Sequence, residues 1–125
     1  MNFISAENKG FRMKFDNGFA ISVQWGPGNY CERKSYHDLE APRKERFWES
    51  VTAEVAVFED ISDEKNIGSR MISIATDGID DVIGWLTPDE VAKAIEIVSG
   101  YQGQTMTGMT GEKYIKDMFK KYSIK

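Results

Sequence analysis

The stretch that decides the fold runs from Phe19 to Cys31 and reads Phe-Ala-Ile-Ser-Val-Gln-Trp-Gly-Pro-Gly-Asn-Tyr-Cys. Its first half alternates, so that apolar side chains point to one face and small or polar ones to the other, as in a half-buried strand. Gly26, Pro27, Gly28 and Asn29 follow at once. Glycines there admit backbone angles that bulky residues avoid and let a ligand approach the main chain closely. The stretch predicts a strand that ends in a binding edge.

A second alternating segment precedes this strand, with Phe11, Met13 and Phe15 on one side, and Asp16-Asn17-Gly18 joins the two. A two-residue Asn-Gly loop would set Phe15 opposite Ala20, whereas a three-residue loop sets Phe15 opposite Phe19 and places the apolar side chains of both strands on one face. The pattern therefore predicts a hairpin with a type I turn, a bulge, and Gly18 in the left-handed conformation.

Three further segments have strand character: 51–59, 71–76 and 82–86. The first alternates with β-branched residues, and Asp77-Gly78 supplies a turn signal between the other two. We predict one α+β domain over residues 1–125, with an antiparallel sheet of about five strands over residues 11–86. Two C-terminal helices, over 88–99 and 112–122, follow the sheet.

The first helix has a strong start signal. Thr87 suits the N-cap, Pro88 the first helical position and Glu90 the reciprocal position of a capping box, while Leu86 and Val91 have the spacing of a hydrophobic staple. Gly100 is expected to end the helix in a left-handed conformation. An apolar stripe at helical spacing is expected to cover the sheet, and it consists of Val91, Ala94, Ile95 and Val98.

The last helix follows a connector rich in Gly, Thr, Gln and Met. Thr110 is its expected N-cap. Its apolar stripe consists of Tyr114, Ile115, Met118, Phe119 and Tyr122. Because a loose tether precedes this helix, one hypothesis is that it packs on a neighbouring subunit rather than on its own sheet.

Composition excludes several classes of function. The formal charge of −4 and a pI near 5.0 argue against general nucleic-acid binding, which needs a basic surface. Cys31 and His37 are the only residues of their types, so a histidine- or cysteine-based metal site is not expected. Without a long apolar run or a signal peptide, we expect no membrane association and a cytoplasmic location. No cofactor is expected.

Candidate catalytic groups are weak. Cys31 with His37 is the only Cys/His combination, and an incidental pairing of a buried cysteine with a surface histidine explains it better. The adjacent carboxylates are better explained by solvated turns than by acid–base catalysis. Those pairs are Glu59 with Asp60, Asp63 with Glu64, and Asp80 with Asp81. We therefore predict a protein that is not an enzyme and has no catalytic residues.

Binding has better support. Trp25, Tyr30 and Tyr36 offer flat faces for a nucleobase, and amides from Gly26 to Asn29 suit a phosphate. Arginines can bind an anion through two parallel hydrogen bonds, and the start of the last helix offers backbone amides that can also bind an anion. The predicted ligand-binding residues are Trp25, Gly26, Gly28, Asn29, Tyr30, Arg33, Arg43, Arg70, Thr110 and Lys113. The competing interpretations are core packing for Trp25, a tight turn for the glycines and a surface strand position for Arg70.

The segment 26–50 has no clear strand or long helix, and a loop of this length in a small domain suggests a function. It carries five basic and five acidic side chains, and a solvated, salt-bridged excursion is an equally good explanation. The basic ones are Arg33, Lys34, Arg43, Lys44 and Arg46, and the acidic ones are Glu32, Asp38, Glu40, Glu45 and Glu49.

The box from Val23 to Cys31, behind a strand and an Asp-Asn-Gly turn, together with the length and the order of a sheet and two helices, resembles the phage anti-Thoeris sponges of the first described type. The resemblance implies a non-enzymatic homo-oligomer in the infected cell. Such a protein sequesters cyclised ADP-ribose signals, with cyclic oligonucleotides as a further ligand class, in pockets between subunits. No individual ligand contact of that family is assigned to these positions.

A second hypothesis comes from a different class of function. The acidic surface and the long loop also suit a protein-binding inhibitor of a host defence nuclease or complex. The two hypotheses differ in what the purified protein retains, because a sponge releases an unchanged nucleotide on heating and an inhibitor holds a host protein.

Overall fold

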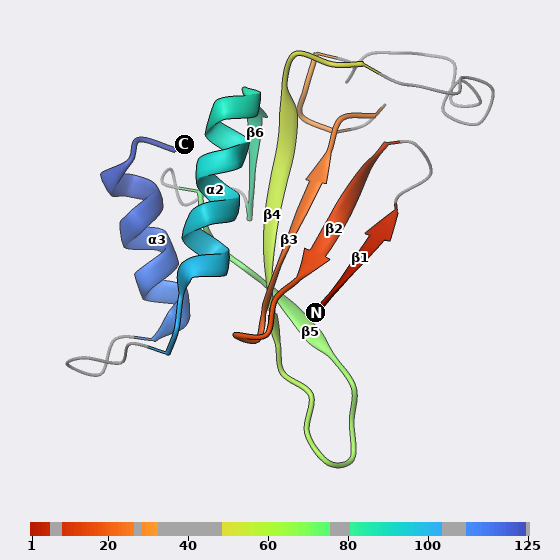
Figure 1. Cartoon of the computed structure of the whole chain (residues 1–125), viewed down its shortest axis with the longest axis vertical. Helices are drawn as coiled ribbons and strands as arrows, with labels where there is room; N and C mark the ends of the chain where they lie inside the picture. The colour runs from red at the N-terminus through yellow and green to blue at the C-terminus, as the bar shows by residue number, and fades with distance from the viewer. Residues whose placement is uncertain (6–8, 27–28, 33–48, 76–80, 104–109, 125) are drawn as a thin grey trace.

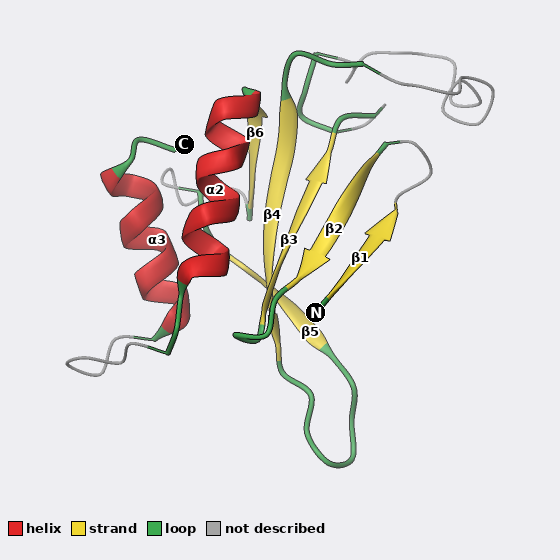
Figure 2. Ribbon diagram, in the orientation of Figure 1, coloured by secondary structure: helices red, strands yellow, loops and turns green. Residues whose placement is uncertain are grey.

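The computed structural model describes residues 1–5, 9–26, 29–32, 49–75, 81–103 and 110–124. In these ranges the chain forms an antiparallel sheet of five strands plus a sixth, followed by two C-terminal helices, as Figures 1 and 2 show. The α+β fold class is confirmed. The elements are β1 Asn2–Ser5, β2 Gly10–Lys14, β3 Phe19–Gln24, β4 Ala53–Asp60, β5 Ser69–Ile72, β6 Val82–Leu86, α2 Pro88–Gly100 and α3 Gly111–Lys121.

The strands lie in the order β1-β2-β3-β4-β5, and β6 also pairs with β4. β5 pairs with the second half of β4, from Val57 to Asp60, whereas β6 pairs with the first half, from Ala53 to Ala56. Both therefore share the edge of β4 that faces away from β3. β1 had not been predicted, because its four residues are exposed and show no buried alternation.

The predicted hairpin turn between β2 and β3 is confirmed. Phe15 N donates to Phe19 O at 2.9 Å, Gly18 N donates to Phe15 O at 3.3 Å, and Gly18 has a φ of +89°. The register pairs Met13 with Ile21, as the three-residue loop requires. With this register, the apolar side chains of both strands lie on the same face of the sheet.

The core lies between that face and the helices. Ile21, Val55 and Val57 are fully buried, and they belong to one cluster with Ala94 and Val98 of α2. The hypothesis that the last helix packs on a neighbouring subunit is wrong. Its Ile115 and Phe119 are fully buried within the same core, and the residue after its last turn, Ile124, joins them.

The predicted start of α2 is confirmed, and its end lies within one residue of the predicted position, but the left-handed conformation predicted for Gly100 is wrong. Thr87 and Glu90 form the reciprocal capping box with Pro88 at the first helical position. Gly100 is the last helical residue and is not left-handed. Asn17 supplies the reason, because its Nδ2 donates to the carbonyls of Val98 and Tyr101, each at 2.8 Å. These carbonyls need no glycine cap when a side chain from the β2–β3 turn satisfies them.

The bounds of two strands and the burial of one helix face also differ from expectation. β4 begins at Ala53 rather than Val51, whose side chain is 64% exposed, and β5 spans Ser69–Ile72 rather than 71–76. In α2 Ile97 is buried, while Ile95 is only half-buried. The predicted turn at Asp77-Gly78 lies outside the described residues.

Substituting the two glycines at the ends of these elements tests the local geometry. Gly18→Ala is expected to destabilise the protein by about 1 kcal/mol, because an L side chain is strained at positive φ. Gly100→Ala is the matched control, and it should stabilise by roughly 0.5–1 kcal/mol because Gly100 is helical and an added Cβ meets nothing within 4 Å. Urea denaturation measures both changes, and a loss of stability for Gly100→Ala would contradict the observed helix end.

Candidate functional site

The corner after β3 is held together by the side chain of Asn29. Gly26 N donates to Asn29 Oδ1 at 3.0 Å, and Asn29 N donates to Gly26 O at 3.1 Å. Asn29 Nδ2 donates to Gln24 Oε1 at 3.3 Å and to Glu54 Oε1 at 3.2 Å. The turn residues predicted to meet a ligand thus bind one another and the neighbouring strand β4.

Glu54 places a carboxylate inside this corner. Its Oε2 accepts a hydrogen bond from Tyr30 N at 2.9 Å, while Oε1 accepts from Asn29. The corner therefore binds an anionic group that belongs to the protein itself. A phosphate approaching the same amides would meet the negative charge of Glu54 and would have to displace it.

Two close approaches explain why glycine occurs on either side of this corner. A Cβ added at Gly26 would lie 2.5 Å from Lys9 Cδ, and one added at Gly84 of β6 would lie 2.3 Å from Tyr30 Cβ. Tyr30 O also accepts a hydrogen bond from Trp85 N at 2.8 Å. The corner is therefore hydrogen-bonded to β6, through Trp85, as well as to β4, through Glu54.

A groove of about 530 Å³ lies beside Trp25, between the end of β3 and the first turns of α2. Trp25 is half-buried and packs edge to face on Phe11, with ring centroids 6.3 Å apart. The apolar walls are Phe11, Val23, Trp25, Val51, Ala53, Leu86, Pro88, Val91, Ala92 and Ile95, and the polar lining residues are Glu49, Ser50 and Thr52.

The groove offers apolar surface and few free polar groups. Glu49 is the one charged side chain among its described lining residues. Ser50 Oγ donates to Thr52 O at 2.6 Å, and Thr52 Oγ1 accepts from Glu32 N at 2.9 Å, so these hydroxyls are engaged in the local turn. Such a groove can bury a flat aromatic or apolar group, and its described residues supply no acid–base pair.

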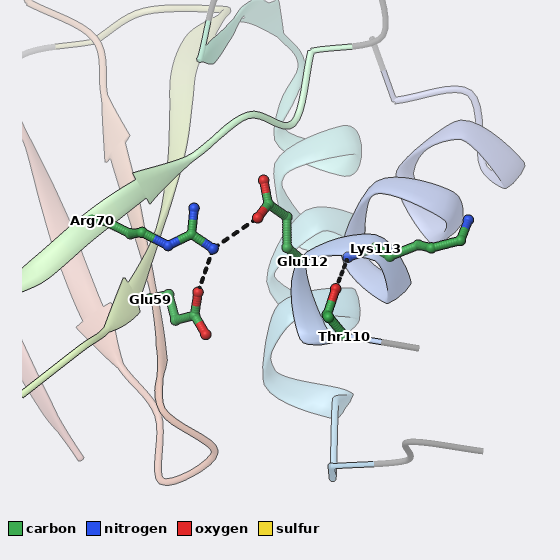
Figure 3. A network of polar contacts seen from close by, with 5 residues as sticks. All are labelled: Glu59, Arg70, Thr110, Glu112 and Lys113. Carbon is green, nitrogen blue, oxygen red and sulfur yellow. Dashed lines mark hydrogen bonds and ion pairs between the residues drawn. The ribbon is translucent and has the colours of Figure 1, made fainter. Parts of the chain in front are cut away.

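A second group of predicted residues lies around the start of α3 (Figure 3). Arg70 Nη2 binds Glu59 Oε2 at 2.7 Å and Glu112 Oε2 at 2.8 Å, which links β5, β4 and α3. Thr110 Oγ1 accepts from Lys113 N at 3.2 Å, which confirms Thr110 as the N-cap. Lys113 Nζ binds Asp117 Oδ2 at 3.0 Å on the same helix.

The Arg70 network shifts the pKa of Arg70 and of Glu112. The hydrogen bond from Arg70 holds the pKa of Glu112 below its ordinary value. The same contact, together with the hydrogen bond to Glu59, raises the pKa of Arg70. Two carboxylates thus bind the single positive charge of Arg70, and these interactions are structural ones that join the sheet to α3.

The structure divides the ten predicted ligand-binding residues. Trp25, Gly26, Asn29 and Tyr30 are together at one end of β3, where Gln24 pairs with Glu54. Arg70, Thr110 and Lys113 are at the other end, where Glu59 is the partner of Phe19, about 17 Å of strand away. Gly28, Arg33 and Arg43 lie outside the described residues.

The adjacent carboxylates serve local turns where the structure describes them. Asp60 Oδ1 accepts from Ser62 N at 2.9 Å, and Asp63 Oδ1 accepts from Lys65 N and Asn66 N at 2.9 and 2.7 Å. Hydrogen bonds from Ser62 lower the pKa of Asp60, and those from the two backbone amides lower the pKa of Asp63. Asp60 and Asp63 are thus ionised carboxylates that accept hydrogen bonds from the backbone amides of their own turns. Within the described ranges no three His, Cys, Asp or Glu side chains are gathered as a metal ion requires.

Sequence reasoning missed most of the groove. Phe11, Val23 and Ile95 had been read as core residues, and Val51 had been placed within a strand. Their shared wall depends on how α2 packs on the face of the sheet near the end of β3, and alternation along one strand carries no signal of that packing. Ile95 lies at the edge of the apolar stripe of its helix. Helical spacing alone could therefore have placed it near the border of the buried face, where the groove lies.

The Glu112 carboxylate makes a pH-dependent contribution to stability. Because its pKa is lowered in the folded state, this contribution is present above the ordinary pKa of 4.5 and is lost as the pH falls through the lower folded value. Glu112→Gln should destabilise the protein at pH 7 by about 0.5 kcal/mol, as for a solvent-screened pair. In urea denaturation the difference should shrink as the pH is lowered below 4.5. The exposed Glu64→Gln is the control, and an equal effect of both substitutions would contradict the role of the Arg70 network.

Comparison with protein families, with curated proteins and with solved structures gave no match. Neither helix of the described chain has the length and hydropathy of a membrane-spanning helix.

Proposed function

We propose that this protein is a non-catalytic binding protein that sequesters a small cyclic nucleotide signal of the cyclised ADP-ribose type. On this proposal it acts in the cytoplasm of a phage-infected cell and releases its ligand unchanged. A sponge lowers the free concentration of a signal by mass action, so it needs tight binding and slow release but no turnover. The single observation that carries the proposal is the aromatic-walled groove beside Trp25.

The size and the walls of the groove support a nucleobase as the group it holds. A volume of about 530 Å³ is in the range of small-molecule sites. A base stacked on an aromatic side chain contributes roughly 1–3 kcal/mol, and a half-buried Trp25 with Phe11 behind it is a firm surface for stacking. The apolar lining suits the base better than the phosphates.

The phosphates need a cationic partner from outside the described walls. The segment 33–48 leaves the described fold after Glu32, whose amide binds Thr52 of the groove, and returns at Glu49, which also lines it. Glu32 and Glu49, the described residues on either side of this segment, are therefore beside the groove. Since the segment carries Arg33 and Arg43 among its five basic residues, we assign the phosphate contacts to it.

The proposal includes a homo-oligomer. β1 is the edge strand of the sheet, and it exposes apolar side chains, with Phe3 76% exposed and Ile4 43% exposed. An uncovered apolar edge strand is a surface on which a second chain can pair. A second subunit on this edge would cover these side chains.

A protein-binding inhibitor of a host defence nuclease or complex is the second candidate function. The apolar character of the Trp25 groove favours it, because an amphipathic helix or extended peptide of a partner can place its apolar side chains in such a groove. The protein would then be recovered with a host protein and without a nucleotide.

Recovery of the ligand separates these functions. The protein is mixed with a nucleotide extract, washed and heated, and the released molecules are identified by mass spectrometry. A sponge returns cyclised ADP-ribose of unchanged mass. Return of a hydrolysed product would contradict a non-catalytic function, and a host protein bound in place of any nucleotide would support the inhibitor.

The contribution of Trp25 is tested by titration calorimetry with cyclic ADP-ribose. Trp25→Ala should weaken binding by about tenfold or more, the scale of one lost base stack. Trp85→Ala is the matched control, because Trp85 is 53% exposed and does not line the groove, and it should bind as the unaltered protein does. Equal affinities for Trp25→Ala and the unaltered protein would exclude the groove as the ligand site.

A further inference from the structure

A second recess lies on the opposite face of the sheet. Phe11 and Met13 of β2 face the helices, so the alternating residues Arg12 and Lys14 point to the other face. The recess has a volume of about 420 Å³, and Arg12, Lys14, Ala20, Phe58 and Asp60 are among its lining residues. It shares none of its described lining residues with the groove beside Trp25.

Small residues on β3 make room for this recess. The ladder places Ala20 between Lys14 and Phe58, and Ser22 between Arg12 and Ala56. Ala20 and Ser22 are both buried and form a floor under the longer side chains. Arg12 reaches across that floor, and its Cζ lies 4.0 Å from the centroid of the Phe58 ring.

Within the described residues neither cation of the recess forms an ion pair at contact distance, although, besides the hydrogen bonds from Ser62, the charge of Lys14 is close enough to Asp60 to help lower the pKa of that carboxyl. Among the described residues no carboxylate binds Arg12 or Lys14, and the buried Nε of Arg12 has no hydrogen-bond acceptor. Stacking on Phe58 therefore orients the guanidinium group without engaging its donors. Asp60 is the one carboxylate in the described lining, and its Oδ1 is bound to Ser62 N. The N-terminal amine, also at this recess, pairs with Asp16 at 3.2 Å.

We infer that this recess, defined by Arg12, Lys14 and Phe58, is a second binding site, and that its ligand is a small oxyanion such as a phosphate or carboxylate group. A planar guanidinium presents parallel donors that match two oxygens of one oxyanion, and a lysine adds a point charge beside it. In a chain of net charge −4, a half-buried arginine that has no carboxylate partner among the described residues, with a lysine on the same face beside it, is best explained by a ligand that supplies the missing charge. The site is independent of the proposed nucleotide groove.

Titration with pyrophosphate and with citrate, followed by two-dimensional NMR of the full chain, tests this site and distinguishes a phosphate from a carboxylate source. Saturable shifts are expected for amides of β2 and β4 around Arg12 and Phe58. Arg12→Gln should weaken binding by about tenfold and Lys14→Gln by about threefold, as for one lost charged contact each. Arg12→Lys should weaken binding by an intermediate factor, because lysine keeps the positive charge but lacks the two parallel N–H donors of the guanidinium group.

Two control variants distinguish binding in this recess from nonspecific attraction of anions. Lys116→Gln removes a positive charge from an exposed position on α3, and Trp25→Ala alters the other groove, so both should leave pyrophosphate binding unchanged. If Arg12→Gln fails to fold, as circular dichroism would show, the exposed Lys14→Gln decides the result. The inference is overturned if neither anion gives saturable shifts, or if Lys116→Gln weakens binding as much as Lys14→Gln does.

Discussion

The structure depends on the alternation of side chains along β3. Ile21 and Val23 face the helices, while Ala20 and Ser22 face the other side, and β3 pairs with β2 on one edge and β4 on the other. A shift of one residue in either pairing would turn the apolar side chains away from the helices. The turn at Gly18 sets one register and Asn17 ties the same turn to the end of α2, so a single turn positions both the sheet and the helix that covers it.

At the end of β3, the polar residues of the corner bind one another, while the apolar groove beside Trp25 remains open. Asn29 and Glu54 accept the amide hydrogen bonds of Gly26 and Tyr30, and the Tyr30 carbonyl joins this corner to β6. Trp25, directly before the corner, keeps one side of its ring in an apolar groove. On the proposed function, the hydrogen bonds that hold Gly26 and Asn29 would help to position Trp25 before a ligand binds, which would reduce the entropy lost on binding.

Local patterns predicted the parts of the fold that depend on neighbours in sequence. The turn at Gly18 and the capping box of Thr87 and Glu90 were both predicted, because each needs only a few adjacent residues. The partnerships of Glu54 with Asn29 and of Arg70 with Glu112 were not, since they join elements 25 and 42 residues apart. The candidate site was predicted only in part for the same reason: Trp25 lines a groove, but its other wall comes from α2 and the residues before β4.

The most direct test of the central claim follows the indole N–H signals of the three tryptophans by NMR during titration with cyclic ADP-ribose. Substitution of each tryptophan by phenylalanine assigns the signals. The account predicts that the Trp25 signal shifts until the ligand saturates the protein, while the Trp85 signal stays in place. Binding that leaves the Trp25 signal unchanged, or a titration in which no indole signal moves, would contradict it.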